Sequence, residues 1–163
     1  MVILGIDPGL ATVGYGALES EHRKMKLLDF GIISTPAKML LSERLDIIYD
    51  SMITLLDRFQ PDAIAFEELF FAKNVKTGIA VAHARGVLMT AAYKRTKELY
   101  EYTPLQVKQA GVGYGRAEKI QIQMMVKNTF GLKEIPRPDD AADAVAIAMC
   151  HAQSAGFAQD FKI

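Results

Sequence analysis

Apolar residues along the chain follow two periods, one typical of strands and one typical of helices. Short apolar runs bounded by turn-forming residues predict five strands, at positions 2–7, 12–18, 26–35, 62–67 and 99–103. Apolar residues at helical spacing predict helices at positions 42–60, 74–96, 104–107, 117–130 and 138–155. Ser42 is the expected N-cap of the first helix, and Gly131 is the expected C-cap after position 130.

The order of these elements predicts the fold class. The first three strands are joined by short connections, which favour an antiparallel meander. The later strands are separated by helices, which favour parallel crossovers. We therefore expect an α/β fold with a five-stranded mixed sheet and helices on both faces. No repeat or low-complexity linker interrupts the chain, so residues 1–163 are expected to form one domain.

The amino-acid composition is typical of a globular protein and excludes few functions. Half of the 163 residues are apolar, which is enough for one good core. No run of about 18 uncharged apolar residues is present, so no membrane contact is expected. The chain starts with a strand pattern and no basic leader, so no secretory signal is expected. Cys150 has no second cysteine to pair with, which fits a packed helix residue in a reducing cytoplasm.

The net charge of zero hides an uneven distribution. Between Ala72 and Arg137 there are 12 Lys and Arg residues against 4 Asp and Glu, whereas the remainder has 7 against 15. A middle region this basic could bind a polyanion. It could equally consist of solvated helix faces, so the charge alone does not decide the matter.

Two carboxylates stand at the ends of predicted strands. Asp7 follows a buried apolar run and precedes a Pro-Gly turn, and Glu67 ends the strand at 62–67. The carboxyl ends of neighbouring parallel strands are where ligands collect in α/β sheets. If the two strands are neighbours, the two carboxylates lie close together and repel each other unless a cation or a proton intervenes. Either residue could also simply end its strand at the solvent.

A second acidic group begins the last predicted helix. Asp140 and Asp143 are three residues apart and share one helix face. Acidic residues at a helix N-terminus are ordinary capping chemistry, but Asp143 is already flanked by small apolar residues. Two strand carboxylates facing these two would suit a hard divalent cation. Two such ions about 4 Å apart could activate a water and stabilise the leaving oxygen of a phosphodiester.

The N-terminal segment GIDPGLATVGYG permits another interpretation. It resembles the first phosphate-binding turn of the actin and sugar-kinase ATPases. Those proteins need two such domains, and 163 residues are too few for both. The length therefore disfavours this interpretation.

Five segments in order resemble the RuvC family of bacterial crossover junction endodeoxyribonucleases, which have a ribonuclease H-like fold. They are GIDPG at 5–9, FEELFFAKN at 66–74, HARGV at 83–87, QVKQAGVGYGRAEKIQIQMMV at 106–126 and DDAADAVAIA at 139–148. One such motif would be weak, but five at this spacing are specific and span nearly the whole chain.

The resemblance implies a metal-binding tetrad of Asp7, Glu67, Asp140 and Asp143. In this family such a tetrad binds Mg²⁺, or Mn²⁺ as a substitute, with two ions expected in each active site. Neighbouring strand residues point to opposite faces, so Glu68 is not expected to be a ligand. Asp139 is rotated by about 100° from the next helix residue, so we expect it to cap the helix.

The resemblance also implies residues that contact DNA. Lys119 matches a lysine that serves cleavage, and Lys108 matches one that serves DNA binding or cleavage. Phe70 matches an aromatic residue that opens base pairs near the junction centre, although Phe71 could take that part and Phe70 could pack in the core. The remaining expected phosphate contacts are Lys73, Lys76, Arg85 and Arg116.

The activity implied is the resolution of four-way Holliday junctions by metal-dependent nicks on two opposed strands, leaving 5′-phosphate and 3′-hydroxyl ends. Implied partners are a second copy of the chain and the branch-migration complex of RuvA and RuvB. The Ala- and Met-rich helix at 74–96 is the best candidate for the dimer face, although its apolar character could equally mean burial within the subunit. Two alternatives remain. The chain could be a ribonuclease H-like nuclease acting on other nucleic-acid structures, or a junction-binding protein that has lost cleavage.

Overall fold

The computed structural model describes residues 1–22, 24–69, 75–113 and 118–163. The strands are β1 (Val2–Asp7), β2 (Thr12–Glu21), β3 (Lys24–Ser34), β4 (Ala63–Glu67) and β5 (Leu99–Tyr102). The helices are α1 (Leu41–Phe59), α2 (Val75–Arg95), α3 (Pro104–Val112), α4 (Lys119–Phe130), α5 (Asp139–Ser154) and the 3₁₀ helix η1 (Ala155–Phe161).

The five strands form one mixed sheet in the order β3-β2-β1-β4-β5. The pairs β1/β2 and β2/β3 are antiparallel, whereas β1/β4 and β4/β5 are parallel. The meander and the two parallel crossovers predicted from connection lengths are confirmed. β1 therefore lies at the centre of the sheet, with β4 directly beside it.

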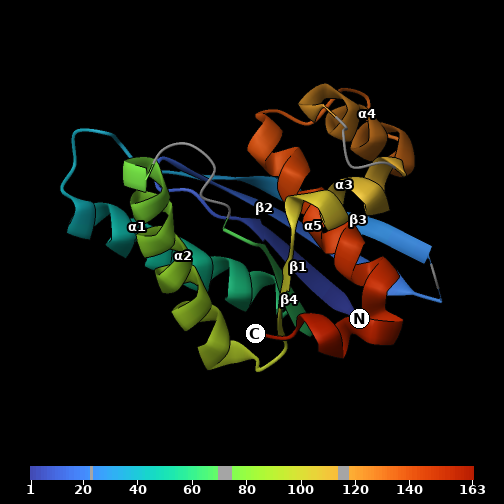
Figure 1. The fold of residues 1–163 in the computed structure, drawn as a ribbon, viewed down its shortest axis with the longest axis horizontal. Helices are drawn as coiled ribbons and strands as arrows, with labels where there is room; N and C mark the ends of the chain where they lie inside the picture. Colours follow the sequence, from blue (N-terminus) through green and yellow to red (C-terminus); the bar gives the residue numbers. More distant parts are fainter. Residues whose placement is uncertain (23, 70–74, 114–117) are drawn as a thin grey trace.

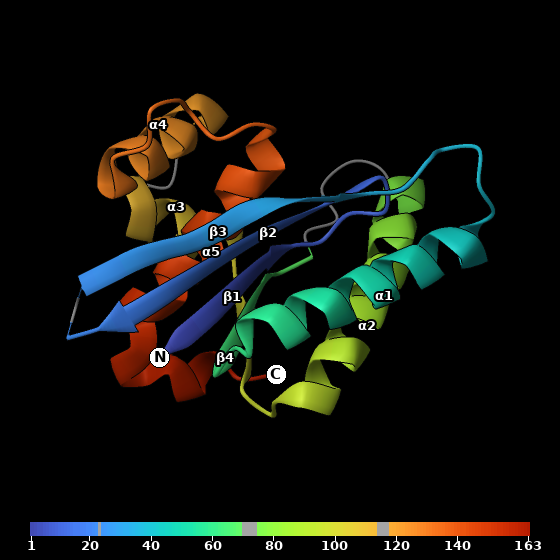
Figure 2. The ribbon, with the colours of Figure 1, turned by 180° about the vertical axis from the view of Figure 1, so that it is seen from behind.

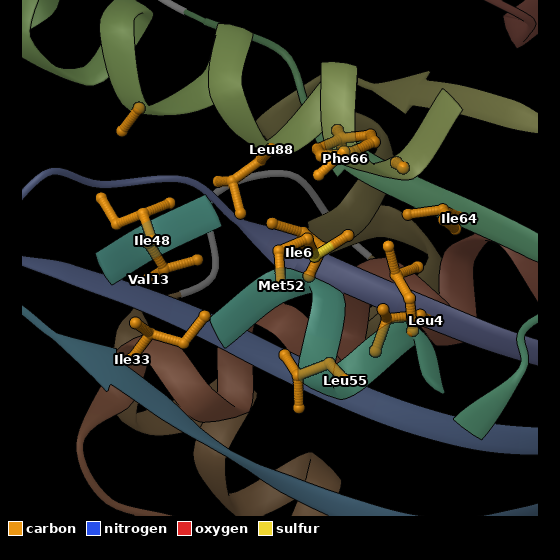
Figure 3. Packing of buried hydrophobic residues seen from close by; sticks show 14 of the residues in the cluster. Leu4, Ile6, Val13, Ile33, Ile48, Met52, Leu55, Ile64, Phe66 and Leu88 are labelled. Carbon is orange, nitrogen blue, oxygen red and sulfur yellow. The ribbon is translucent and has the colours of Figure 1, made fainter. Parts of the chain in front are cut away.

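One face of the sheet is covered by α1 and α2 (Figures 1 and 2). Alternate residues of the central strands, such as Leu4, Ile6 and Phe66, point to this side. They pack against apolar residues at helical spacing, including Met52 of α1 and Leu88 of α2 (Figure 3). All five side chains are fully buried, and this layer is the largest of the three apolar clusters.

The other face is covered by α5, with α3 and α4 beside it (Figure 1). α5 comes so close to the sheet because the strands present glycines beneath it. A Cβ on Gly5 would lie 2.1 Å from the carbonyl oxygen of Ala144, and one on Gly16 would lie 2.7 Å from the backbone of Val145. Direct contact between helix and strand backbones fixes α5 against β1 and β2.

Three local features differ from the sequence predictions. The N-cap of α1 is Leu40, not Ser42, and the Glu43 carboxylate accepts a hydrogen bond from the Leu40 N–H at 2.9 Å. α3 is longer than predicted, because Thr103 caps it and it continues to a left-handed Gly113. η1 was not predicted at all. The C-cap expected at Gly131 is confirmed by its φ of 64°.

Within the described ranges, none of the helices has both the length and the apolar character needed to cross a membrane.

Candidate functional site: four carboxylates beneath the start of α5

Asp7 and Glu67 end the two central parallel strands. Ile6 pairs with Phe66 in the parallel register, so the residues that follow lie side by side at the same edge. Strand alternation places Asp7 on the face of Gly5 and Glu67 on the face of Ala65, which is the face covered by α5. Both side chains are half-buried. The sequence prediction that these two strands are neighbours is confirmed.

The first turns of α5 bring the second acidic pair to the same place. Asp7 pairs with Gly14 across β1 and β2. Gly14 in turn touches the backbone of Asp140, since a Cβ there would lie 2.0 Å from the Asp140 carbonyl oxygen. Asp143 lies one turn further along α5 and is half-buried, between the fully buried residues Ala142 and Ala144. The missing side chain of Gly14 thus allows α5 to start directly over Asp7.

Three carboxyls of the cluster have raised pKa values, and negative charges of the neighbouring carboxylates contribute to each shift. Burial and the negative charges of the other three raise the pKa of the Asp7 carboxyl to about 8. Burial and the charge of Asp143 raise the pKa of Glu67 to about 7. Burial raises the pKa of Asp143 to about 6, and Asp139 and Asp140 add to the effect. Such mutual repulsion marks a place where a cation would be favourable.

The donor set fits a hard divalent cation, because all four side chains offer carboxylate oxygens at a partly exposed edge. In the part of the chain that the structure describes, no three Asp, Glu, His or Cys side chains stand ready to hold a metal ion. Ligation of one ion by three of the carboxylates therefore requires some side-chain rotation. The metal site therefore stays a prediction. The carboxylate oxygens and the raised pKa values of the cluster support it.

Two lysines approach the cluster from the neighbouring helices. Lys119 is the first residue of α4, and its ammonium lowers the pKa values of Asp7, Glu67 and Asp143. Lys108 of α3 lowers those of Glu67 and Asp143. Both lysines predicted from the sequence therefore lie within electrostatic reach of the carboxylates.

Asp139 has a partner that the sequence did not predict. Its carboxylate forms an ion pair with Lys119. Glu68, by contrast, lies beyond the end of β4 with an exposed side chain, and its backbone N–H donates to the Tyr102 carbonyl at 2.9 Å.

The expected phosphate contacts have different surroundings. Lys76 is exposed near the start of α2. Arg85 is only 14% exposed and forms an ion pair with Glu101 of β5, so a phosphate contact would require it to leave or share that partner. Its Nε is buried with no hydrogen-bond partner among the described residues. Phe70, Phe71, Lys73 and Arg116 lie outside the described residues.

A buried pair between α5 and β5 was not predicted from the sequence. His151 of α5 is 2% exposed, and its Nδ1 shares a hydrogen bond of 2.8 Å with the Tyr102 hydroxyl. Burial lowers the pKa of His151 to about 4, so this histidine is neutral at pH 7. Nearby Cys150 is buried as expected, and burial raises the pKa of its thiol to about 11.

The chain is similar to known proteins over nearly its whole length. The family model described as crossover junction endodeoxyribonuclease RuvC matches residues 3–151. A relative of that name from Alkaliphilus oremlandii is 53% identical over 163 residues, covering 100% of this chain and 99% of the relative. Another, from Finegoldia magna, is 56% identical over 151 residues, covering 93% and 92%.

Solved structures give the same result. Thermus thermophilus RuvC in complex with a Holliday junction substrate superposes with a TM-score of 0.87 at 39% identity, covering 95% of this chain and 94% of that one. The yeast mitochondrial Holliday junction resolvase Ydc2, at 15% identity and a TM-score of 0.67, shares the fold. The ribonuclease H-like α/β fold expected from the sequence is confirmed.

Proposed function

The chain belongs to the RuvC family of crossover junction endodeoxyribonucleases, and we propose that it resolves four-way Holliday junctions in DNA. It does so by nicking two opposed strands and leaving 5′-phosphate and 3′-hydroxyl ends. The observation that carries this proposal is the gathering of four carboxylates at the ends of β1 and β4 under the start of α5. A protein that only bound junctions would gain nothing from holding four mutually repelling carboxylates together.

Asp7, Glu67, Asp140 and Asp143 are the proposed ligands of Mg²⁺, with Mn²⁺ as a substitute and two ions in each site. Bound there, such ions supply a nucleophilic water and neutralise charge on the leaving oxygen. The protein itself contributes a rigid base, because the strands and α5 are in backbone contact. It also contributes Lys119 and Lys108, whose ammonium groups can balance charge on the scissile phosphate.

The DNA would extend from this edge over the basic middle of the chain. We propose Lys76 and Arg85 as phosphate contacts, together with Lys73 and Arg116, and Phe70 as the residue that stacks on an unpaired base. The support for these contacts is the excess of Lys and Arg over positions 72–137 and the quoted sequence resemblance.

A second copy of the chain would pair through α2. Ile79 and Tyr93 are both more than half exposed, and Gly86 lies midway between them with open space above it. A spacing of seven residues keeps the three on one helix face, as helix–helix pairing requires. A symmetric dimer would place one active site on each of two opposed junction strands. The further proposals are RuvA and RuvB as partners, a cytoplasmic location, and action of the whole chain as one domain.

The function is tested with a labelled four-way junction and a linear duplex of matching sequence, each incubated with the protein and Mg²⁺. We expect paired nicks in the junction and little cutting of the duplex. Equal cutting of both would contradict the junction assignment and leave only a nuclease. If neither the junction nor the duplex is cut, the proposed nuclease activity is wrong.

The carboxylate site is tested with Asp7→Asn. The variant should lower Mg²⁺-dependent cleavage by at least roughly 100-fold, since metal-supplied stabilisation amounts to several kcal/mol. Junction binding in a gel-shift assay should stay close to that of the unchanged protein. Asp57→Asn is the matched control, because Asp57 lies on α1 and pairs with Arg95 on the far side of the sheet. Retained nicking by the Asp7 variant would contradict the metal site.

A further inference from the structure

Two helices begin next to each other at the carboxylate cluster with residues of opposite charge. Lys119 is the first residue of α4, and Asp139 is the first residue of α5. Their side chains form an ion pair, with side-chain exposures of 69% for Lys119 and 34% for Asp139. The pair is therefore accessible from solvent at the rim of the cluster.

Helix stability does not explain why a lysine stands at this position. The N-terminus of a helix carries a partial positive charge, which disfavours a cation there by a few tenths of a kcal/mol. The acidic N-cap of α4, Glu118, offsets part of this effect, and the first turn contains no further acidic residue. Asp139, from the start of a different helix, adds a negative charge that pairs directly with the Lys119 ammonium.

The ammonium of Lys119 has a competing set of partners. It lowers the pKa values of three of the four carboxylates, so these also attract it. A lysine side chain has a flexible four-carbon stem and could turn onto Asp140 or Asp143. There it would neutralise the oxygens that a divalent cation needs. In the structure the ammonium instead pairs with Asp139.

We propose that Asp139 is a positioning residue that holds the Lys119 ammonium at the rim of the carboxylate cluster. An ammonium has three N–H donors, so one can stay on Asp139 while the others face the scissile phosphate. Asp139 thereby keeps Lys119 ready for the phosphate and away from the metal-binding oxygens. This inference rests on the proposed function, and it assigns to Asp139 no direct contact with metal or substrate.

The test is a double-mutant cycle of Asp139→Asn and Lys119→Gln, measured by junction cleavage under saturating and limiting DNA. Asp139→Asn should lower kcat by roughly two- to fivefold with little change in KM, as expected for the modest coupling of an exposed ion pair. In the Lys119→Gln background the same substitution should have no further effect on kcat. Asp139→Glu should restore most of the loss.

Two measurements without DNA complete the design. Titration with Mn²⁺ should show weaker binding to Asp139→Asn than to the unchanged protein, and this difference should vanish in the Lys119→Gln background. Thermal unfolding should shift by no more than about 1–2 °C, because exposed ion pairs contribute little stability. Asp57→Asn, which breaks another exposed ion pair, should leave kcat and Mn²⁺ binding unchanged.

The outcomes are distinguishable. If Asp139→Asn lowers kcat equally with and without Lys119, Asp139 acts by its own charge and the inference is wrong. If it changes neither kcat nor Mn²⁺ binding while the unchanged protein cuts junctions, the inference is also wrong but the proposed function stands. If the unchanged protein cuts nothing in Mg²⁺, the proposed function itself fails.

Discussion

Replacing Gly14 with alanine should disable the site without touching any charged residue. The added Cβ would lie 2.0 Å from the Asp140 carbonyl oxygen and 2.6 Å from its carbonyl carbon. Real Cβ contacts are essentially never shorter than 3.0 Å. The start of α5 must therefore move away from β2 by about 1 Å or more. Both contacts are to backbone atoms, so no side-chain rotation can relieve the clash.

The consequences can be given as magnitudes. Overpacking of this kind destabilises a protein by about 1–3 kcal/mol. A displacement of about 1 Å among reacting groups lowers activity by roughly 100-fold. Since α5 carries Asp140 and Asp143 while β1 carries Asp7, the displacement falls between the two halves of the cluster.

The assay compares junction cleavage and urea unfolding of the Gly14→Ala protein at a temperature where it is fully folded. Gly156→Ala is the control for unfolding, because Gly156 lies in η1 and nothing lies within 4 Å of its added Cβ. A Gly14→Ala protein that is as stable as the unchanged one and cuts junctions at the same rate would refute the close contact between α5 and β2.

Two further predictions concern stability. His151 is buried as the neutral form with a pKa of about 4, below the 6.5 of the unfolded chain, so the unfolded state binds the extra proton between these values. The contribution of His151 to the free energy of unfolding should therefore be fully present above pH 6.5 and fall by roughly 3 kcal/mol as the pH drops towards 4. Urea unfolding at a series of pH values measures this loss. In a His151→Phe variant this part of the loss should disappear. Phe66→Ala should lower the free energy of unfolding by about 3–5 kcal/mol, since Phe66 is fully buried between β4 and the α1–α2 layer; a loss below about 1 kcal/mol in urea titration would contradict that packing.

The sheet could be predicted from the sequence because its strands carry strong, local signals. β1 starts and ends where its apolar run does, and the length of each connection determined whether the next strand was parallel or antiparallel. Helix ends were less predictable. Ser42 is a good N-cap residue, but Glu43 reaches back to the Leu40 N–H and starts α1 earlier. Two competing caps within three residues cannot be separated by propensity alone.

The sequence predicted which residues form the site, but not the contacts that bring them together. Position at a strand end identified Asp7 and Glu67, and helical spacing paired Asp140 with Asp143. The contact that joins the pairs runs through Gly14, whose importance depends on which helix crosses β2. The Lys119–Asp139 ion pair likewise depends on two helix starts meeting in space. Neither contact has a local sequence signal.

The place of α5 in the fold has a consequence for biosynthesis. α5 is the last long helix of the chain, yet it packs on β1 and β2, which are made first. A growing chain that has been made as far as α4 already carries Asp7, Glu67 and Lys119, but the half of the acidic cluster that α5 contributes has not yet been made. The centre of the sheet also remains uncovered on one face until then, with Gly5, Gly14 and Gly16 open to water. The cluster is therefore assembled in the same late step that buries this face, so that only chains folded this far bear all four carboxylates together.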